Sequence, residues 1–200
     1  MRLFRPCFIA DCLYPDAIFR IKTTEKILCL TFDDGPDPAS TPHLLDILDR
    51  YNIKALFFCD GTAAEKYPAL LDQIMKRGHL TGNHGYNHLN GWLTSPESYV
   101  ADVLSADPYS TSGFFRPPYG RIRLSQYKEL KRKYKIVFWD IIPYDFDNSF
   151  GSGNSLSVLK KKISPGSIIV LHDTSHSVAN KILDEFITFS KKEGYRFDFP

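Results

Sequence analysis

The sequence lacks the features that mark several large classes of protein. It has no apolar run that approaches the ~20 residues needed to cross a membrane. Its 200 residues include only four scattered cysteines, and a chain of this length buries roughly 70% of its unfolded surface, so it needs no disulfide framework. Cys7 and Cys12 are the one pair whose spacing suggests a disulfide. We expect a monomeric single domain without a membrane span.

An excess of charge of one sign is also missing. The 25 basic residues nearly balance the 23 acidic ones, which leaves a net charge of +2 at pH 7. This balance provides neither a basic surface for nucleic acid nor an acidic tail. The first 16 residues contain no apolar run of the length found in secretory signals. We therefore expect a cytoplasmic location for the sequence as written, and an extracytoplasmic one if a leader has been removed.

Internal repeats and glycine-rich phosphate loops are absent, but strand and helix patterns alternate regularly. Short apolar runs predict strands at 27–32, 53–59, 79–84, 113–118, 135–140, 166–173 and 195–199. Helical patterns occupy most of the intervals, and 149–155 reads as a flexible loop. Alternation of this kind predicts a parallel sheet covered by helices, and the length suits a small or incomplete barrel better than a closed eight-unit one. An open doubly wound sheet is the alternative, although no glycine-rich loop follows the first strand.

Polar side chains gather where the predicted strands end. In a parallel barrel these ends share one face, where active sites are built. We expect residues that are far apart in the sequence to converge there. The residues in question are Asp33, Asp34, His84, His88, Arg116, Trp139, Asp140, Asp145, His172 and Asp173.

The histidines in HGYNH and the aspartate pair in TFDDGP suggest a metal site. His84 and His88 are four residues apart, and two histidines with one aspartate complete the three-ligand set of a catalytic zinc site. One aspartate can bind the metal while the other takes a proton from water that the metal activates. The alternative is that the pair belongs only to a turn, which accounts for Gly35 but not for the other polar residues.

Two further residues have both a structural and a chemical interpretation. Arg116, in RPPYG, suits the task of holding a carboxylate in place, or it forms a surface salt bridge. His172 follows the apolar run GSIIVL, and is either a buried core histidine or a positioned acid.

Five segments occur in the order TFDDGP, HGYNH, RPPYG, WD…D and LHD. Together they resemble the motifs of the polysaccharide deacetylase family, the NodB homology domain of carbohydrate esterase family 4. The resemblance implies an α/β fold, a distorted seven-stranded (β/α) barrel of NodB type, in residues 27–200. Residues 1–26 are then expected to form an N-terminal extension that packs on the barrel.

The resemblance also implies an activity. It implies a hydrolase that uses a divalent metal, usually zinc with cobalt or nickel as alternatives, to remove acetyl groups from N-acetylglucosamine-type sugars. The substrate partner would be an acetylated oligosaccharide or polysaccharide. Three alternatives are an O-acetyl esterase of the xylan type, a hydrolase of cyclic amides, and a non-catalytic relative that binds carbohydrate.

Metal and proton chemistry follow from the same resemblance. It makes Asp33 the general base that takes a proton from water. It makes Asp34, His84 and His88 the metal ligands. Arg116 would orient Asp33.

The resemblance assigns the remaining site residues as well. His172 would be the general acid, with Asp145 as the carboxylate that tunes it. The backbone N–H of Tyr119 would help to hold the oxyanion, and Leu171 would line a small pocket for the acetyl methyl group. The other expected substrate-binding residues are Trp139 and Pro117.

The sequence departs from the family pattern at two positions. Gly85 stands where the family usually has Ser or Thr, so a hydroxyl that braces the metal loop is missing. Phe146 stands where the family often has Trp, so an indole donor is lost. Neither change touches an expected ligand or proton carrier, and we expect an active enzyme.

Overall fold

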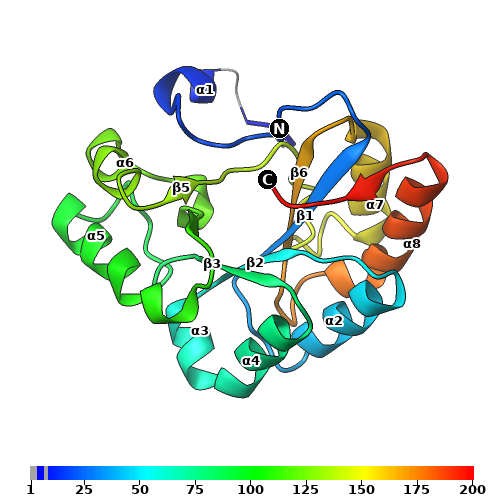
Figure 1. Ribbon diagram of the computed structural model, residues 1–200, viewed down its shortest axis with the longest axis horizontal. Coiled ribbons are helices and arrows are strands. Elements are labelled where there is room, and N and C mark those ends of the chain that lie inside the picture. The colour runs from blue at the N-terminus through cyan, green and yellow to red at the C-terminus, as the bar shows by residue number, and fades with distance from the viewer. Residues whose placement is uncertain (1–3, 7–8) are drawn as a thin grey trace.

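A computed structural model describes residues 4–6 and 9–200. In this part of the chain, seven strands form one curled sheet whose paired strands all run parallel (Figure 1). The order is β5-β4-β3-β2-β1-β6, with β7 also beside β1. The parallel sheet of seven strands is confirmed. The strands are β1 (Ile27–Asp33), β2 (Leu56–Cys59), β3 (Leu80–Asn83), β4 (Phe114–Phe115), β5 (Lys135–Ile136), β6 (Ser167–His172) and β7 (Arg196–Phe197).

Helices surround the sheet on its outer side (Figure 1). They are α1 (Ile9–Leu13), α2 (Thr41–Arg50), α3 (Gly61–Lys66), α4 (Pro68–Lys76), α5 (Pro96–Ser105), α6 (Leu124–Leu130), α7 (Ser152–Lys162) and α8 (Ala179–Lys192), with 3-10 turns η1 (Asp107–Tyr109) and η2 (Pro118–Gly120). The sequence patterns missed α1, α3 and α7. The predicted loop at 149–155 is wrong from Ser152 onward, because Leu159 is fully buried in the core and Leu156 packs against it. Tertiary packing of this kind outweighs the weak helix preference of Gly and Ser.

The two ends of the sheet are joined through the N-terminal segment. The N–H of Ile18 donates to the carbonyl of Ile136, and the N–H of Phe138 donates to the carbonyl of Ile18, both at 2.8 Å. Farther along, the N–H of Ile21 donates to the carbonyl of Gly166 at 2.8 Å. Residues 18–21 therefore span the gap between the β5 and β6 sides of the sheet.

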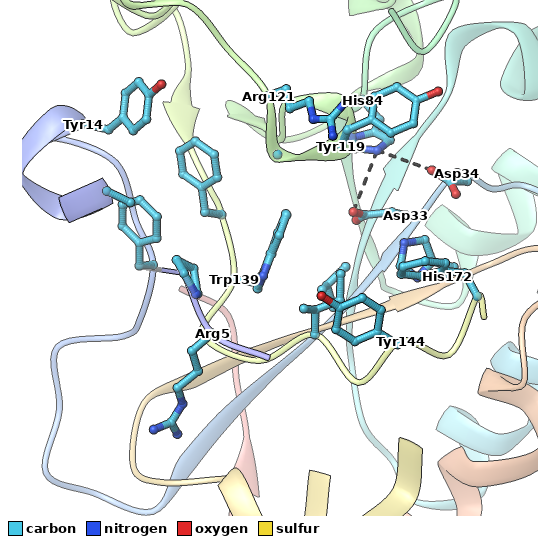
Figure 2. A pocket seen from close by; sticks show the side chains of 18 of the residues that line it. Arg5, Tyr14, Asp33, Asp34, His84, Tyr119, Arg121, Trp139, Tyr144 and His172 are labelled. Atoms are coloured by element: carbon cyan, nitrogen blue, oxygen red, sulfur yellow. Dashed lines mark ion pairs between the residues drawn. The ribbon is translucent and has the colours of Figure 1, made fainter. Parts of the chain in front are cut away.

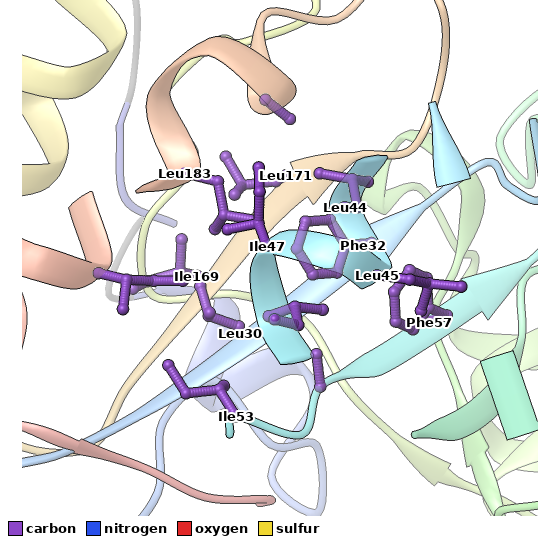
Figure 3. Close-up of a cluster of buried hydrophobic side chains, with 14 of the residues drawn as sticks. Leu30, Phe32, Leu44, Leu45, Ile47, Ile53, Phe57, Ile169, Leu171 and Leu183 are labelled. Carbon is purple, nitrogen blue, oxygen red and sulfur yellow. The ribbon is translucent and has the colours of Figure 1, made fainter. Parts of the chain in front are cut away.

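The first strand is buried on both faces, as expected for a parallel sheet. Leu30 and Phe32 pack on the outer side in the main core, which α2 and α8 cover (Figure 3). Cys29 points the other way, into a smaller cluster with Phe58 and Ile168. Alternate side chains of β1 thus pack into the interior of the barrel and against the surrounding helices.

Two expectations about composition can be compared with the described residues. Cys12, Cys29 and Cys59 are free thiols, while Cys7 lies outside the described residues. Among the helices of residues 4–6 and 9–200, none has both the length and the apolar character needed to cross a membrane.

Candidate active site

A cavity of about 940 Å³ opens where the strands end (Figure 2). At one side of it the structure brings together Asp33, Asp34, His84, His88 and His172, although these residues come from three separate strands and loops. Aromatic side chains form much of the remaining wall: Tyr14, Phe19, Trp92, Tyr119, Phe138, Trp139, Tyr144 and Phe146.

The adjacent carboxylates Asp33 and Asp34 both lie near Nε2 of His84, at 3.8 Å and 3.4 Å, but their other partners differ. Asp33 is the last residue of β1 and is 4% exposed. Asp34 has a φ of 74°, in the left-handed region that aspartate tolerates better than most residues.

Arg116 holds Asp33 through a buried ion pair. Its Nη1 lies 2.6 Å from Oδ1 of Asp33 and also donates to the hydroxyl of Thr31 at 2.6 Å. Nε donates to the carbonyl of Val137 at 3.2 Å, and Nη2 donates to the carbonyl of Phe138 at 2.8 Å. The guanidinium also stacks over a phenylalanine ring of β2, at 4.2 Å from the centroid. The fully buried Arg116 is therefore fixed on every side, and it fixes Asp33 in turn.

Asp34 lies between the two histidines of the HGYNH segment. Its Oδ1 is 3.4 Å from Nε2 of His84 and 3.2 Å from Nε2 of His88. Although burial opposes it, hydrogen bonding to both histidines holds the pKa of Asp34 well below its usual value. Nδ1 of His84 lies 2.8 Å from the carbonyl of Arg116, which leaves Nε2 directed at the carboxylate. Two imidazoles and a carboxylate in this arrangement suit a divalent metal such as zinc.

Asp102 of α5 anchors the loop that carries the two histidines. Its carboxylate accepts hydrogen bonds from the N–H of Tyr86 at 3.0 Å, from the N–H of Asn87 at 3.1 Å and from the side-chain amide of Asn87 at 2.6 Å. Gly85 has a φ of 78°, and a Cβ at this position would lie 3.1 Å from the same carboxylate. Asp102 therefore braces the loop that, in the family pattern, a hydroxyl at position 85 would brace.

Asp60 belongs to the same cluster, and the sequence analysis missed it. One carboxylate oxygen of Asp60 lies with ligand atoms of Asp34, His84 and His88 in a group whose members are all within 4.8 Å of one another. Burial raises the pKa of Asp60 well above its usual value, and the nearby Asp33 and Asp34 add to this. Its position directly after β2, in FFCDG, was the available signal, since the other site residues also follow strand ends.

His172, at the end of β6, is paired with a fully buried carboxylate. Nδ1 of His172 lies 3.0 Å from Oδ1 of Asp145, whose Oδ2 accepts from the His172 N–H and from the hydroxyl of Ser177, both at 2.7 Å. Burial lowers the pKa of the imidazole, but Asp145 and the more distant Asp34 and Asp33 outweigh it and raise the pKa to about 9. The ring is therefore protonated at neutral pH, as a general acid must be.

Tyr119 and Trp139 belong to the aromatic wall of the cavity. The ring of Tyr119 meets that of His88 edge to face, with 4.5 Å between centroids. Its backbone has a φ of 59°, followed by Gly120 at 64°. A Cβ at Gly120 would lie 2.4 Å from the indole of Trp139, so only glycine allows the two segments to approach this closely.

Leu171 and Pro117 are not among the residues that line the cavity in the described part of the chain. Leu171 is fully buried in the main core, near Leu183 and Leu44 (Figure 3), and its neighbour Val170 lines the cavity instead. Successive side chains of a strand point to opposite faces, so Val170 and His172 share the side that faces the cavity. Pro117 is buried beneath the turn, where its carbonyl accepts from the Gly120 N–H at 2.9 Å. The expected roles of Leu171 and Pro117 against the substrate stay predictions.

Two other acids that follow strand ends have structural partners. Asp140 forms ion pairs with Arg20 at 2.7 Å and Arg5 at 3.3 Å, which tie the N-terminal segment to the sheet. Asp173 accepts from the hydroxyl of Thr41 at 2.6 Å, and burial raises its pKa to about 7. Neither of these acids lines the cavity in the described part of the chain.

Comparison with known proteins gives consistent similarities. Residues 20–137 match the family profile described as Polysaccharide deacetylase. Over 189 residues the chain is 34% identical to a peptidoglycan-N-acetylglucosamine deacetylase of Bacillus cereus, which covers 90% of this chain and 88% of that protein. It is 32% identical over 193 residues to the peptidoglycan-N-acetylmuramic acid deacetylase PdaA of Bacillus subtilis, with 91% and 73% covered.

Solved structures agree with this result. The crystal structure of the Bc1960 peptidoglycan N-acetylglucosamine deacetylase superposes with a TM-score of 0.88 at 30% identity, and covers 96% of this chain and 94% of that one. The backbone therefore follows that of a deacetylase over nearly its whole length, which confirms the predicted fold.

Proposed function

Because the chain belongs to the polysaccharide deacetylase family, we propose that it is a metal-dependent enzyme that removes the acetyl group from N-acetylglucosamine-type sugars. Family membership makes it a carbohydrate deacetylase. The metal dependence, the sugar and the role of each residue are the parts that we propose.

One observation carries the proposal: a base and an acid face the same cavity, and each has its own buried partner. Asp33 is held by Arg116, and His172 is held by Asp145. A carboxylate and an imidazole that are each held in place by a buried partner beside one cavity are typical of acid–base catalysis. Asp34, His84 and His88 line the same cavity, and Nε2 of His84 lies 3.8 Å from Oδ2 of Asp33, which supports a cation site close to the proposed base.

The proposed metal would be held by Asp34, His84 and His88. When bound, a divalent cation polarises the acetyl carbonyl and makes a neighbouring water more acidic. The donor set fits zinc, and the buried contact of His84 with the Arg116 carbonyl orients a ligand in the way that metal sites commonly require.

The proton transfers follow from the residues of this chain. Asp33 takes a proton from the attacking water as a new C–O bond forms at the acetyl carbon. The backbone N–H of Tyr119 donates to the carbonyl oxygen as it gains negative charge. His172 then gives its proton to the sugar nitrogen as the C–N bond breaks, so that acetate and a free amine leave. An amine is a poor leaving group without that proton, which is why an acid with a pKa of about 9 suits an amide substrate.

The shape of the cavity supports a sugar substrate. Its volume of about 940 Å³ is near the upper end of the ~300–1,000 Å³ that ligand sites occupy, so a sugar and an attached neighbour both fit. Flat aromatic walls such as Trp92, Tyr119 and Trp139 offer surfaces against which the apolar face of a sugar ring can pack.

Acetate release tests the proposal. Purified protein would be incubated with N-acetylated chito-oligosaccharides, peptidoglycan fragments and O-acetylated xylan, each with zinc and with a chelator. We expect zinc-dependent release from the N-acetylated sugars. His172→Ala should impair amide cleavage more than ester cleavage, because an alkoxide leaves more readily than an amide anion. If no acetylated glycan yields metal-dependent acetate, the proposal is wrong.

A further inference from the structure

We infer that Asp60 is a fourth protein ligand of the cation site, so that the site consists of two histidines and two carboxylates. The inference rests on the proposed metal dependence, and goes beyond it by adding a residue that the family resemblance does not assign. Three features of Asp60 carry it: its backbone position, an oxygen without a partner, and its distance from the other ligand atoms.

The backbone position of Asp60 is one at which an aspartate side chain usually caps a helix. Asp60 is the N-cap residue of α3, with φ −69° and ψ 134°. Aspartate at an N-cap usually accepts a hydrogen bond from an N–H of the first helical turn. Here the side chain makes no such bond. The N–H of Gly61 instead donates to the carbonyl of Gly85 at 2.9 Å, and the N–H of Thr62 donates to the carbonyl of Tyr86 at 3.0 Å. The histidine loop thus caps the helix, which releases the carboxylate of Asp60 for another partner.

The released carboxylate is buried without a partner. Oδ1 of Asp60 is withdrawn from solvent, and no group among the described residues donates a hydrogen bond to it. A buried polar atom left in this state costs free energy, and more when it carries charge, so such atoms are rare unless a ligand or ion completes them. Its backbone is rigid, because its N–H donates to the carbonyl of Gly35 at 3.1 Å and its carbonyl accepts from Ala64 at 2.9 Å.

The Asp60 side chain lies close enough to the other ligand atoms for a cation to be its missing partner. One oxygen of Asp60 shares the 4.8 Å group with the ligand atoms of Asp34, His84 and His88. Two neutral imidazoles and two carboxylates together carry a charge of −2, which balances a divalent cation in a buried setting. A second carboxylate also makes the site richer in oxygen, which favours hard cations such as manganese more than a site with one carboxylate does.

Metal binding, measured apart from catalysis, tests the inference. Zinc affinity would be measured by competition with a chromophoric chelator on metal-free protein, for the natural chain, Asp60→Asn, Asp60→Ala and Glu65→Gln. Glu65 is the matched control, because it lies on α3 and accepts from the Tyr86 hydroxyl at 2.6 Å without belonging to the cluster. The visible spectrum of cobalt-loaded protein gives a second readout that responds directly to the ligand set.

We expect Asp60→Ala to weaken zinc binding by about 100-fold or more, beyond the effect typical of residues that only orient ligands. Asp60→Asn should weaken it less, both variants should change the cobalt spectrum, and Glu65→Gln should change neither. Because Asp60 makes no cap bond and its Oδ1 has no partner in the described structure, both variants should fold. Natural zinc affinity and an unchanged cobalt spectrum in both variants would overturn the inference. That result is distinct from failure of the proposed function, in which the natural chain would bind no metal or release no acetate.

Discussion

Oδ1 of Asp33 lies 2.6 Å from Nη1 of Arg116, and Arg116 has no surface exposed to solvent. Replacing Arg116 by Met leaves the carboxylate of Asp33 buried without its cation. Removing one partner of a buried ion pair costs about 3–5 kcal/mol, so we expect the free energy of unfolding to fall by that amount and turnover to be lost. Denaturant unfolding and acetate release would measure the two effects.

A surface ion pair provides the control for this prediction. Arg50 lies 3.0 Å from Asp184, and their side chains are 63% and 47% exposed. Arg50→Met should cost no more than about 1 kcal/mol and leave activity intact. Equal losses in the Arg50 and Arg116 variants would contradict the role that we give to burial.

The neighbouring aspartates should not be interchangeable. Asp33→Asn keeps the shape of the residue but removes the base, so metal content should stay at the natural level while kcat falls by about 100-fold or more. Asp34→Asn removes the carboxylate shared by His84 and His88, so metal content itself should fall. Zinc analysis beside acetate release on the same samples would separate the two outcomes. Retained turnover in Asp33→Asn would exclude Asp33 as the base.

The pairing of His172 with Asp145 predicts a shift in the pH profile. The raised pKa keeps the imidazole protonated at neutral pH, so activity should decline on the alkaline side as the ring loses its proton. Asp145→Asn removes the negative charge that does most to raise the pKa of His172. Burial then dominates, and the pKa of His172 should fall toward or below its usual 6.5. The alkaline limb of kcat against pH should therefore move to lower pH. A bound cation near Asp34 would lower the starting value, but the direction of the shift would be the same.

The same pair makes a contribution to stability whose sign can be stated. The folded pKa of His172 lies above the unfolded value, so the contribution is complete below pH 6.5 and is lost as pH rises through about 9. Metal-free protein unfolded in urea across this range should lose stability on the alkaline side. Asp145→Asn should lose that dependence.

The sequence predicted the order of elements and the convergence of distant residues well, because apolar runs and strand-end positions are local signals. It did not predict the conformations that give the residues their roles. Asp34, His88 and Tyr119 all have a positive φ, at 74°, 53° and 59°. Non-glycine residues rarely adopt this conformation, and the modest preference of Asp and His for it does not single out these positions. Only the packed surroundings hold these three residues there.

The sequence also could not show which side chains are engaged in tertiary contacts and which remain available to the site. Asp60 follows a strand and Asp102 lies within a predicted helix, but neither position reveals that one joins the cation cluster and the other accepts from the histidine loop. Asp140 looked equally eligible for the site, and it pairs instead with Arg20 of the N-terminal segment. Such assignments depend on contacts between residues that are distant in the sequence.

The loop anchored by Asp102 should govern metal affinity without contacting the metal. Asp102→Ala removes the acceptor for the N–H groups of Tyr86 and Asn87, and we expect zinc affinity to fall by about 10–100-fold. Gly85→Ser should have a similar effect, since its Cβ would lie 3.1 Å from Asp102 at a φ unfavourable to side chains. Glu97→Gln, an exposed acid on the same helix, is the control. Natural zinc affinity in both loop variants would refute this role.

Val170 and Leu171 should have opposite effects although they are adjacent. Val170 lines the cavity, so Val170→Ala adds room and should raise the preference for propionyl over acetyl substrates by about 10-fold in kcat/KM. Leu171 lies in the core, so Leu171→Ala should cost about 2–5 kcal/mol of stability and leave the preference unchanged. Paired kinetics with acetyl and propionyl glucosamine, together with denaturant unfolding, would measure both. A change of acyl preference in Leu171→Ala, with none in Val170→Ala, would indicate that Leu171 lines the acyl pocket and Val170 does not.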